Sequence, residues 1–200
     1  VIEGTGAYTA VDGERTTMHP GDFIITPAWT WHDHGSTADG PVIWMDGLDV
    51  PLVRFLGAGF REEHGEMAQI LTRPEGDSDA RYGAGMLPLD SKPTHTSPIF
   101  NYPYARTREA LHQLTLTGAP DPHHGYALRY VNPTTGDWAI PTIATSMRLF
   151  PAGFTSRPYR STDGAVLVLV EGSLNAKVGQ SSFALNAKDV LAIPAWTEYS

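Results

Sequence analysis

A long pattern near the start of the chain returns near its end. Residues 1–35 read VIEGTGAYTAVDGERTTMHPGDFIITPAWTWHDHG, and residues 169–200 read LVEGSLNAKVGQSSFALNAKDVLAIPAWTEYS. In both copies a strand-like run ends in EG, a polar run and a turn follow, and an apolar run closes on PAW. The aligned pairs are Gly4 with Gly172, Asp22 with Asp189, Pro27 with Pro194, and Trp29 with Trp196. Internal repetition predicts one structural unit built twice, with a long connection between the copies.

The runs within these copies have the alternation and β-branched content of strands. GAYTAV, DFIITP, GSLNAKV and GAVLVLVEG fit this pattern, and MRLFPAGF and PVIWMDGLDVPLV are further β-rich runs, the last broken at DG. The chain also holds 20 Gly and 16 Pro, which favour turns over long helices. Repeated short strands with Gly-rich turns predict an all-β chain of sandwiches or small barrels.

The connection between the copies contains one predicted helix, near residues 106–116. Ala110, Leu111 and Leu114 give it an apolar face at helical spacing. Residues 61–98 are rich in Gly, Pro and Asp, and we expect an irregular connection there. The expected division of the chain is a first barrel at 1–57, a linking region at 58–138 and a second barrel at 139–200.

Composition excludes several classes of protein. The formal net charge is -8 and Lys and Arg do not cluster, which argues against a nucleic-acid partner. The absence of Cys excludes disulfides and thiolate nucleophiles, so any metal would be held by His and carboxylate groups. No apolar run is long enough for a membrane span, and no signal peptide is visible, so a cytoplasmic protein is expected. The chain starts at Val1 and stops at AWTEYS, and we expect a fragment of a longer protein with both barrels incomplete.

The PAW run of the first copy contains most of a known metal-binding motif. The second motif of cupins, which are double-stranded β-helix (jelly-roll) barrels, reads Gly, five residues, Pro, one residue, usually Gly, two residues, His. Gly21, Pro27 and His32 match it, with Trp29 in the position of the second glycine. Gly4 fits the glycine that ends the first cupin motif. The HxH pair of that first motif would then fall upstream of Val1.

A longer set of motifs resembles one family. WTWHDHG, VIWMDGLDVP, SPIFNYPYARTREAL and HHGYALRYVNPTTG occur in this order and are similar to the bicupin gentisate 1,2-dioxygenases, with salicylate and 1-hydroxy-2-naphthoate dioxygenases as close relatives. The resemblance implies a bicupin fold, a homotetramer, and one Fe(II) per subunit in the N-terminal cupin. It makes His32 a metal ligand, His34 a histidine that contacts substrate or oxygen, and Asp46 an acidic residue involved in the chemistry. The two other histidine ligands and an arginine for the substrate carboxylate would lie upstream of Val1.

The second copy departs from the metal-binding pattern. Gly153 opens its first motif, and the positions of the HxH pair fall at Tyr159 and Ser161, while the position of the last histidine falls at Tyr199. None of these is a good Fe(II) ligand, so the C-terminal cupin is expected to be metal-free.

The chemistry implied by the resemblance is ring cleavage of gentisate with O2 to give maleylpyruvate, in the breakdown of aromatic compounds. A non-haem Fe(II) site needs open positions for substrate and O2. Because side chains alternate along a strand, His32 and His34 should face the barrel interior together. Asp33 or a backbone carbonyl is expected to orient His32, and Asp46 to orient His34.

Plainer interpretations exist for these and neighbouring residues. Asp46 also fits a DG turn, and Asp49 is expected to be structural. His123 and His124 are expected in a solvated loop. The activity can instead be the sister reaction on salicylate or 1-hydroxy-2-naphthoate, and an alternative of another class is a non-catalytic cupin that binds a ligand. With two ligands upstream, we expect the isolated chain to be inactive.

Overall fold

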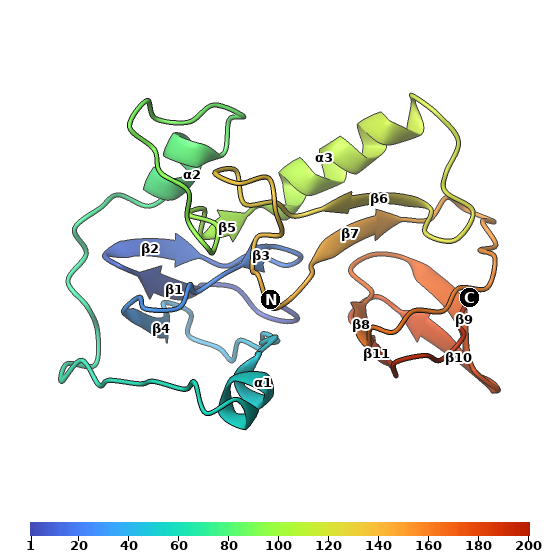
Figure 1. Ribbon diagram of the computed structural model, residues 1–200, viewed down its shortest axis with the longest axis horizontal. Coiled ribbons are helices and arrows are strands. Elements are labelled where there is room, and N and C mark those ends of the chain that lie inside the picture. The colour runs from blue at the N-terminus through green and yellow to red at the C-terminus, as the bar shows by residue number, and fades with distance from the viewer. The chain divides into compact units, whose positions relative to one another are not determined.

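The computed structural model describes residues 1–200, which divide into two compact units. The first unit comprises residues 1–108 and 129–147, and the second comprises residues 109–128 and 148–200. Strands outnumber helices, as predicted, and no sheet holds more than three strands (Figure 1). None of the helices is both long and apolar enough to cross a membrane.

The elements follow one another in the chain with short strands throughout. The strands are β1 Ala7–Val11, β2 Glu14–Thr17, β3 Phe23–Ile24, β4 His32–Ser36, β5 Asn101–Tyr102, β6 Tyr126–Arg129, β7 Ser146–Leu149, β8 Ala165–Val168, β9 Ser173–Val178, β10 Ser181–Asn186 and β11 Val190–Ile193. The helices are α1 Val50–Phe55, α2 Asp77–Tyr82 and α3 Tyr104–Thr115.

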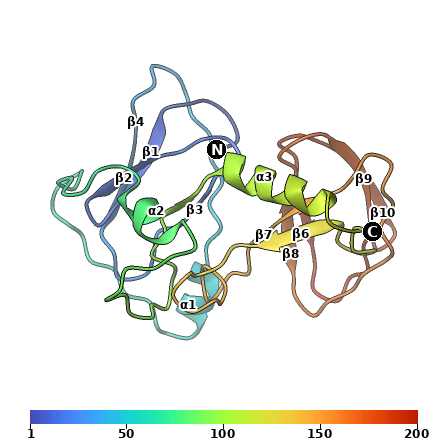
Figure 2. The ribbon, with the colours of Figure 1, turned by 90° about the horizontal axis from the view of Figure 1, so that it is seen from above.

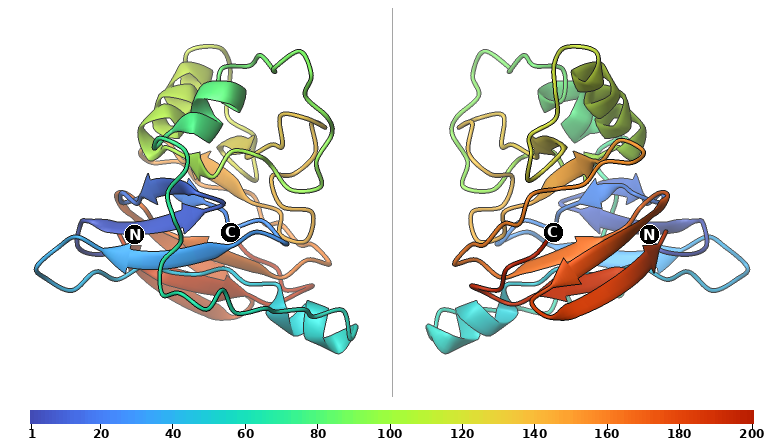
Figure 3. Two further views of the ribbon diagram at one scale, coloured as in Figure 1. Left: turned by 90° about the vertical axis from the view of Figure 1, so that its left-hand side faces the viewer. Right: turned by 90° about the vertical axis from the view of Figure 1, so that its right-hand side faces the viewer.

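The central sheet of the first unit is antiparallel, in the order β2-β1-β4 (Figure 3). Asp12 and Gly13 form the turn between β1 and β2, with φ of 44° and 83°. Positive φ at both central residues matches the right-handed twist of a hairpin, which explains the Asp-Gly pair at this point. Strand β1 is almost wholly buried, and Val11 and Ala7 are fully so. The hairpin therefore forms the core against which β4 is placed.

An aromatic cluster fills a second part of this unit, where β3 pairs with β5. The rings of Phe23, Tyr102 and Tyr130 lie 4.6–5.6 Å apart, centroid to centroid. The Tyr102 hydroxyl lies 2.6 Å from Ser97 Oγ and 2.7 Å from the Val131 carbonyl oxygen. Burial raises the pKa of Tyr102 to about 12, and the hydrogen bond with Ser97 offsets only part of this effect.

The repeat seen in the sequence is present in the backbone. Trp29 and Trp196 both adopt left-handed conformations, with φ of 64° and 60°. Each stands where the cupin motif usually has glycine, the residue that adopts positive φ at least cost. Asp22 accepts a hydrogen bond from the backbone N–H three residues before it, at 3.0 Å, and Asp189 does the same at 2.8 Å. The two copies thus share a turn and a left-handed tryptophan, as well as similar sequences.

Helix α3 confirms the predicted helix, and two other helices correct the sequence-based expectations. Figure 2 shows α3 as one continuous helix. Leu111 is its buried residue, in line with the predicted apolar face. The β-rich interpretation of residues 41–53 was wrong at its end, because α1 begins after Asp49 with Pro51 in its first turn. Proline has the φ of a first helical turn and lacks the N–H that would be unpaired there. Residues 61–98 are largely irregular, as expected, but contain α2, whose first turn carries Asp77 and Asp79.

The second unit holds two antiparallel pairs, β8 with β11 and β9 with β10. Leu191 and Ile193 of β11 are its buried apolar residues in these ladders. Tyr159 and Tyr199 form a bridge outside the named strands, with N–H···O distances of 2.8 and 2.9 Å in the two directions. The end of the second repeat is therefore tied to the segment that carries the first motif of that copy.

The strained tryptophan gives a first prediction, from the pair Trp196→Gly and Trp196→Ala. Both remove the side chain that lies beside Arg160, but only glycine relieves the left-handed conformation. We expect the free energy of unfolding in urea to be about 1 kcal/mol higher for the Gly variant than for the Ala variant. An Ala variant as stable as the Gly variant would contradict this account of the repeated turn.

The buried phenol gives a second prediction, on the pH dependence of stability. Between pH 10 and about 12 the unfolded chain loses the Tyr102 proton while the folded chain keeps it, so stability falls as pH rises through this window. Tyr102→Phe should lower stability at pH 7 by about 1–3 kcal/mol, because the Val131 carbonyl loses its donor. It should also make the decline between pH 10 and 12 shallower. Urea denaturation at a series of pH values measures both effects. If stability falls equally steeply between pH 10 and 12 in the variant and in wild type, the predicted pH effect is refuted.

Candidate functional site

Strand β4 positions the two histidines singled out in the sequence. In the antiparallel register, His32 lies opposite Val11 and His34 lies opposite Thr9. Residues opposite one another point to the same face of a sheet, and both Val11 and Thr9 are buried. His32 and His34 therefore share a face with these buried residues, but at the β4 edge both histidines are themselves exposed. Their ring centroids lie 5.7 Å apart.

The backbone next to His32 favours one orientation of its ring. Nδ1 of His32 lies 3.5 Å from the carbonyl oxygen of Thr30, at the long end of hydrogen-bond distances. A carbonyl at Nδ1 leaves Nε2 free as an electron-pair donor. Asp33 does not orient the His32 ring, because its side chain is on the opposite face and accepts the Gln69 N–H at 3.0 Å. Of the two expected orienting groups, the structure has the backbone carbonyl.

His34 lies between His32 and an aromatic side chain. Its ring lies 6.0 Å from the Trp44 ring, centroid to centroid. Partial burial lowers the pKa of His34, and the nearby His32 lowers it further, whereas Asp46 and Asp33 act in the opposite direction. The net lowering of the His34 pKa favours a neutral imidazole, which has one hydrogen-bond donor and one acceptor.

The two acidic residues that follow have different surroundings. Asp46 lies in an extended stretch with no assigned turn, close enough to His34 to affect its pKa. Asp49 precedes α1, where its carbonyl accepts the N–H groups of Leu52 and Val53. Its carboxylate also accepts the Thr142 hydroxyl at 2.6 Å. Asp46 is thus the carboxylate available to the histidine pair, and Asp49 holds backbone in place.

The donor set around β4 fits a divalent metal only in part. Imidazole is a suitable ligand for Fe(II), and His32 presents Nε2 from an ordered strand. Within residues 1–200, however, no group of three or more His, Cys, Asp or Glu side chains is arranged to hold a metal ion. The described residues provide one well-oriented candidate ligand and one neighbouring imidazole.

The second copy has aromatic residues where the first has imidazole. Tyr199 occupies the position equivalent to His32, and its ring lies 5.8 Å from that of Tyr159, in an edge-on arrangement. His124 packs edge-on against Tyr159 at 4.5 Å, and both His123 and His124 are half-buried. These histidines lie in a turn, as expected, and Tyr159 leaves them partly rather than fully solvated.

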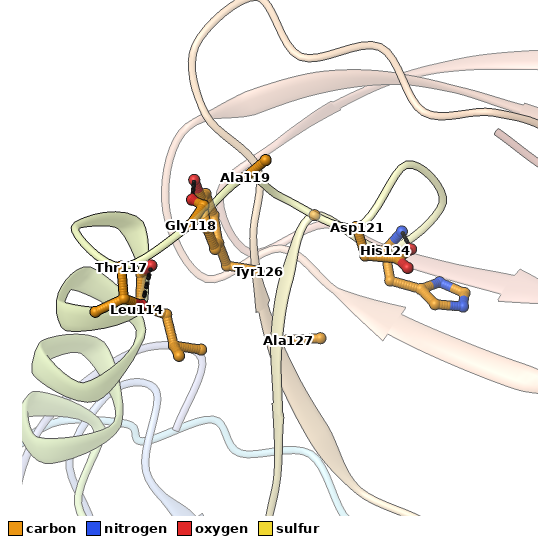
Figure 4. A pocket seen from close by; sticks show the side chains of 9 residues that line it. Leu114, Thr117, Gly118, Ala119, Asp121, His124, Tyr126 and Ala127 are labelled. Atoms are coloured by element: carbon orange, nitrogen blue, oxygen red, sulfur yellow. Dashed lines mark hydrogen bonds between the residues drawn. The ribbon is translucent and has the colours of Figure 1, made fainter.

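A hollow of about 400 Å³ lies beside this loop in the second unit (Figure 4). Leu114 and Thr117 line one side, Tyr126 and Ala127 line the middle, and His124 lies beyond Asp121. Asp121 accepts the N–H groups of His123 and His124, which lowers its pKa and fixes the loop. Since the carboxylate is occupied by its own loop, the hollow offers few polar groups to a ligand.

Sequence reasoning missed two residues near the histidines. Trp44 is two positions before Asp46 in an extended stretch, and the same-face alternation of that stretch was the signal that could have identified it. Gln69 contacts β1 and β4 from a segment far away in the sequence, and no pattern in the chain indicates this.

Comparison with known proteins identifies the class of this chain. Residues 1–50 match the Cupin_2 family, described as a cupin domain. Gentisate 1,2 dioxygenase 1 of Aquipseudomonas alcaligenes is 50% identical over 197 residues, which cover 98% of this chain and 57% of that protein. The 1-hydroxy-2-naphthoate 1,2-dioxygenase of Nocardioides sp. (strain KP7) is 34% identical, covering 96% of this chain and 50% of that protein.

A solved structure agrees with these sequence relationships. The salicylate 1,2-dioxygenase of Pseudoaminobacter salicylatoxidans, crystallised as an adduct with gentisate, superposes with a TM-score of 0.83 at 28% identity, over 100% of this chain and 57% of that chain. The match to a cupin domain thus covers the first quarter of the chain. Along nearly its whole length the chain is a homologue of the gentisate 1,2-dioxygenases and their sister ring-cleaving dioxygenases, and it spans little more than half of their length.

Proposed function

We propose that this chain forms part of a metal-dependent dioxygenase that cleaves the ring of gentisate. The proposal is supported above all by the pair of imidazoles, His32 and His34, on one face of β4 in a chain 50% identical to a gentisate 1,2-dioxygenase. The reaction adds both atoms of O2 and breaks the ring between the carbons that bear the carboxylate and the adjacent hydroxyl. The product is maleylpyruvate.

The proposed cofactor is Fe(II), one per subunit in the N-terminal cupin. His32 would hold it through Nε2, since Nδ1 faces the Thr30 carbonyl. When bound, the metal would supply open coordination positions for the oxygen donors of the substrate and for O2. The other ligands are proposed to come from the part of the longer relatives that this chain does not span.

His34 and Asp46 are the proposed catalytic residues. A neutral His34 would donate a hydrogen bond to the substrate hydroxyl, which orients the ring and stabilises charge that develops on that oxygen. Asp46 would hold the other nitrogen of His34 and so select its tautomer. Trp44, beside His34, offers an apolar surface for an aromatic substrate.

Other features of the proposal come from the sequence, and the homotetramer from the resemblance. They are a cytoplasmic homotetramer, a metal-free C-terminal cupin, and a division into residues 1–57, 58–138 and 139–200. Salicylate or 1-hydroxy-2-naphthoate is the alternative substrate, supported by relatives named for these compounds. A non-catalytic cupin that binds a ligand is the alternative of another class, and the histidine pair on β4 favours the enzyme over it.

The third prediction tests the metal ligand in the full-length protein that contains this chain. After anaerobic loading with Fe(II), gentisate and air should give oxygen uptake and a ring-opened product that absorbs in the near ultraviolet. His32→Ala should lower iron content and reduce turnover by about 10²-fold or more, because a ligand is lost. His112→Ala, which removes an exposed histidine of α3, should behave as wild type. Turnover of salicylate or 1-hydroxy-2-naphthoate alone would indicate a sister activity, and bound iron without any turnover would favour the non-catalytic cupin.

The fourth prediction separates His34 from His32. His34→Ala should keep the iron content of wild type but lower kcat by about 10²-fold, as expected for the loss of a hydrogen-bonding group that acts on the substrate. Asp46→Asn should lower kcat in the same direction by a smaller factor. Iron analysis beside steady-state kinetics measures both, and an iron-free His34→Ala protein would make His34 a ligand instead.

A further inference from the structure

A segment without secondary structure is tied to the β1–β2 hairpin at one end of the central sheet. The N–H groups of Thr72 and Arg73 donate to the Gly13 carbonyl at 3.0 and 3.1 Å. A side chain at Gly13 would collide with Thr72 Oγ1, so the segment lies directly over the turn. Between residues 54 and 70, only Gln69 is not exposed. Gln69 is therefore the point at which residues 54–70 are partly buried against the sheet, and Thr72 and Arg73 continue the contact over the turn.

Gln69 uses its hydrogen-bonding groups on both strands of the β1–β4 pair. Its Nε2 donates to the Ala10 carbonyl at 3.0 Å and to the Trp31 carbonyl at 3.3 Å. Its Oε1 accepts the Gly13 N–H, and its own backbone N–H donates to Asp33 Oδ2 at 3.0 Å. One residue thus bonds to the two strands and to the turn that joins β1 to β2.

The bonds to β4 fall on the two neighbours of His32 in the chain. Trp31 is the residue before it and Asp33 the residue after it, while no hydrogen bond joins Gln69 to His32 itself. β4 is the edge strand of its sheet, so its outer side has no further strand to hold it. Other restraints act at its start. Trp31 and Asp12 exchange hydrogen bonds with N–H···O distances of 3.0 Å, the Thr9 hydroxyl donates to the Asp33 carbonyl at 3.3 Å, and the His64 ring packs edge-on against Trp31.

We propose that Gln69 is a positioning residue, which holds the backbone on both sides of His32 so that the imidazole keeps the direction needed for metal binding. The inference rests on the proposed function for the role of His32. Its physical basis is that a strand end held by few bonds opens locally, and opening at residues 31–33 turns His32 away from the buried face. Gln69 touches neither substrate nor metal, and it acts through the strand.

The direct test replaces Gln69 by Leu, which has a similar size and no hydrogen-bonding groups, in the full-length protein. Affinity for Fe(II), measured by competition with a chromogenic chelator, should fall about 10–100-fold, as for other residues that hold a metal ligand in place. The kcat per bound iron should stay within about threefold of wild type, because the proposed catalytic groups His34 and Asp46 are untouched. Unchanged iron affinity in a folded Gln69→Leu protein would overturn the proposal.

Two further variants separate positioning from plain stabilisation. Arg73→Met removes hydrogen bonds to the carbonyls of Val11 and Asp12 on the same hairpin without a bond to β4, so it should lower stability and leave iron affinity as it was. Asp33→Asn keeps an oxygen that accepts the Gln69 N–H, and Asp33→Leu does not. The Asn variant should retain more iron affinity than the Leu variant. Equal losses of iron affinity in Gln69→Leu and Arg73→Met would mean that the stability of the hairpin, and not the orientation of the His32 side chain, determines the affinity for Fe(II).

Hydrogen exchange tests the same idea without metal or substrate. In the metal-free protein, amides of residues 31–34 should exchange about tenfold faster in Gln69→Leu than in wild type, while those of β9 and β10 stay unchanged. Unchanged exchange at residues 31–34 would refute the positioning role whatever the enzyme does. If exchange rises as expected but the wild type binds no iron and cleaves no substrate, the proposed function fails and the restraint on β4 stands.

Discussion

The antiparallel register between β1 and β4 determines where the candidate site lies. With His34 opposite Thr9 and His32 opposite Val11, both imidazoles lie on the face of these two buried residues, where they are exposed at the sheet edge. A slip of one residue would turn both to the other face and bring Asp33 in their place. Two features at the start of β4 support this register: the exchange between Asp12 and Trp31, and the bonds of Gln69.

The parts of the fold that the sequence predicted are those with a local cause. The strands of the repeat and α3 were predicted because alternation and helical spacing are visible within a few residues. The end of the β-rich run at 41–53 was misassigned, since a proline that suits a first helical turn was read as part of a strand. Gln69 could not be predicted, because its partners lie 36–59 positions away and depend on the path of an irregular segment.

At the candidate site, too, the features with a local cause could be predicted and those set by distant contacts could not. The alternation of WHDHG was enough to predict that His32 and His34 share a face, and the register confirms it. Which group orients His32 was left open, because a backbone carbonyl and a carboxylate are equally near in sequence. The choice followed from tertiary structure: Asp33 is engaged by Gln69, and the Thr30 carbonyl remains.

The two copies of the repeat share a backbone conformation but carry side chains of different chemistry. Both have the same aspartate-centred turn and the same left-handed tryptophan, so the chain reaches the position after PAW in similar ways. The first copy then presents the imidazole of His32, a side chain with a nitrogen lone pair suited to a metal. The second presents the phenol of Tyr199, whose ring packs against that of Tyr159. The same backbone turn thus presents an imidazole in one copy and aromatic packing in the other, so the side chain, and not the turn, decides the chemistry of this position.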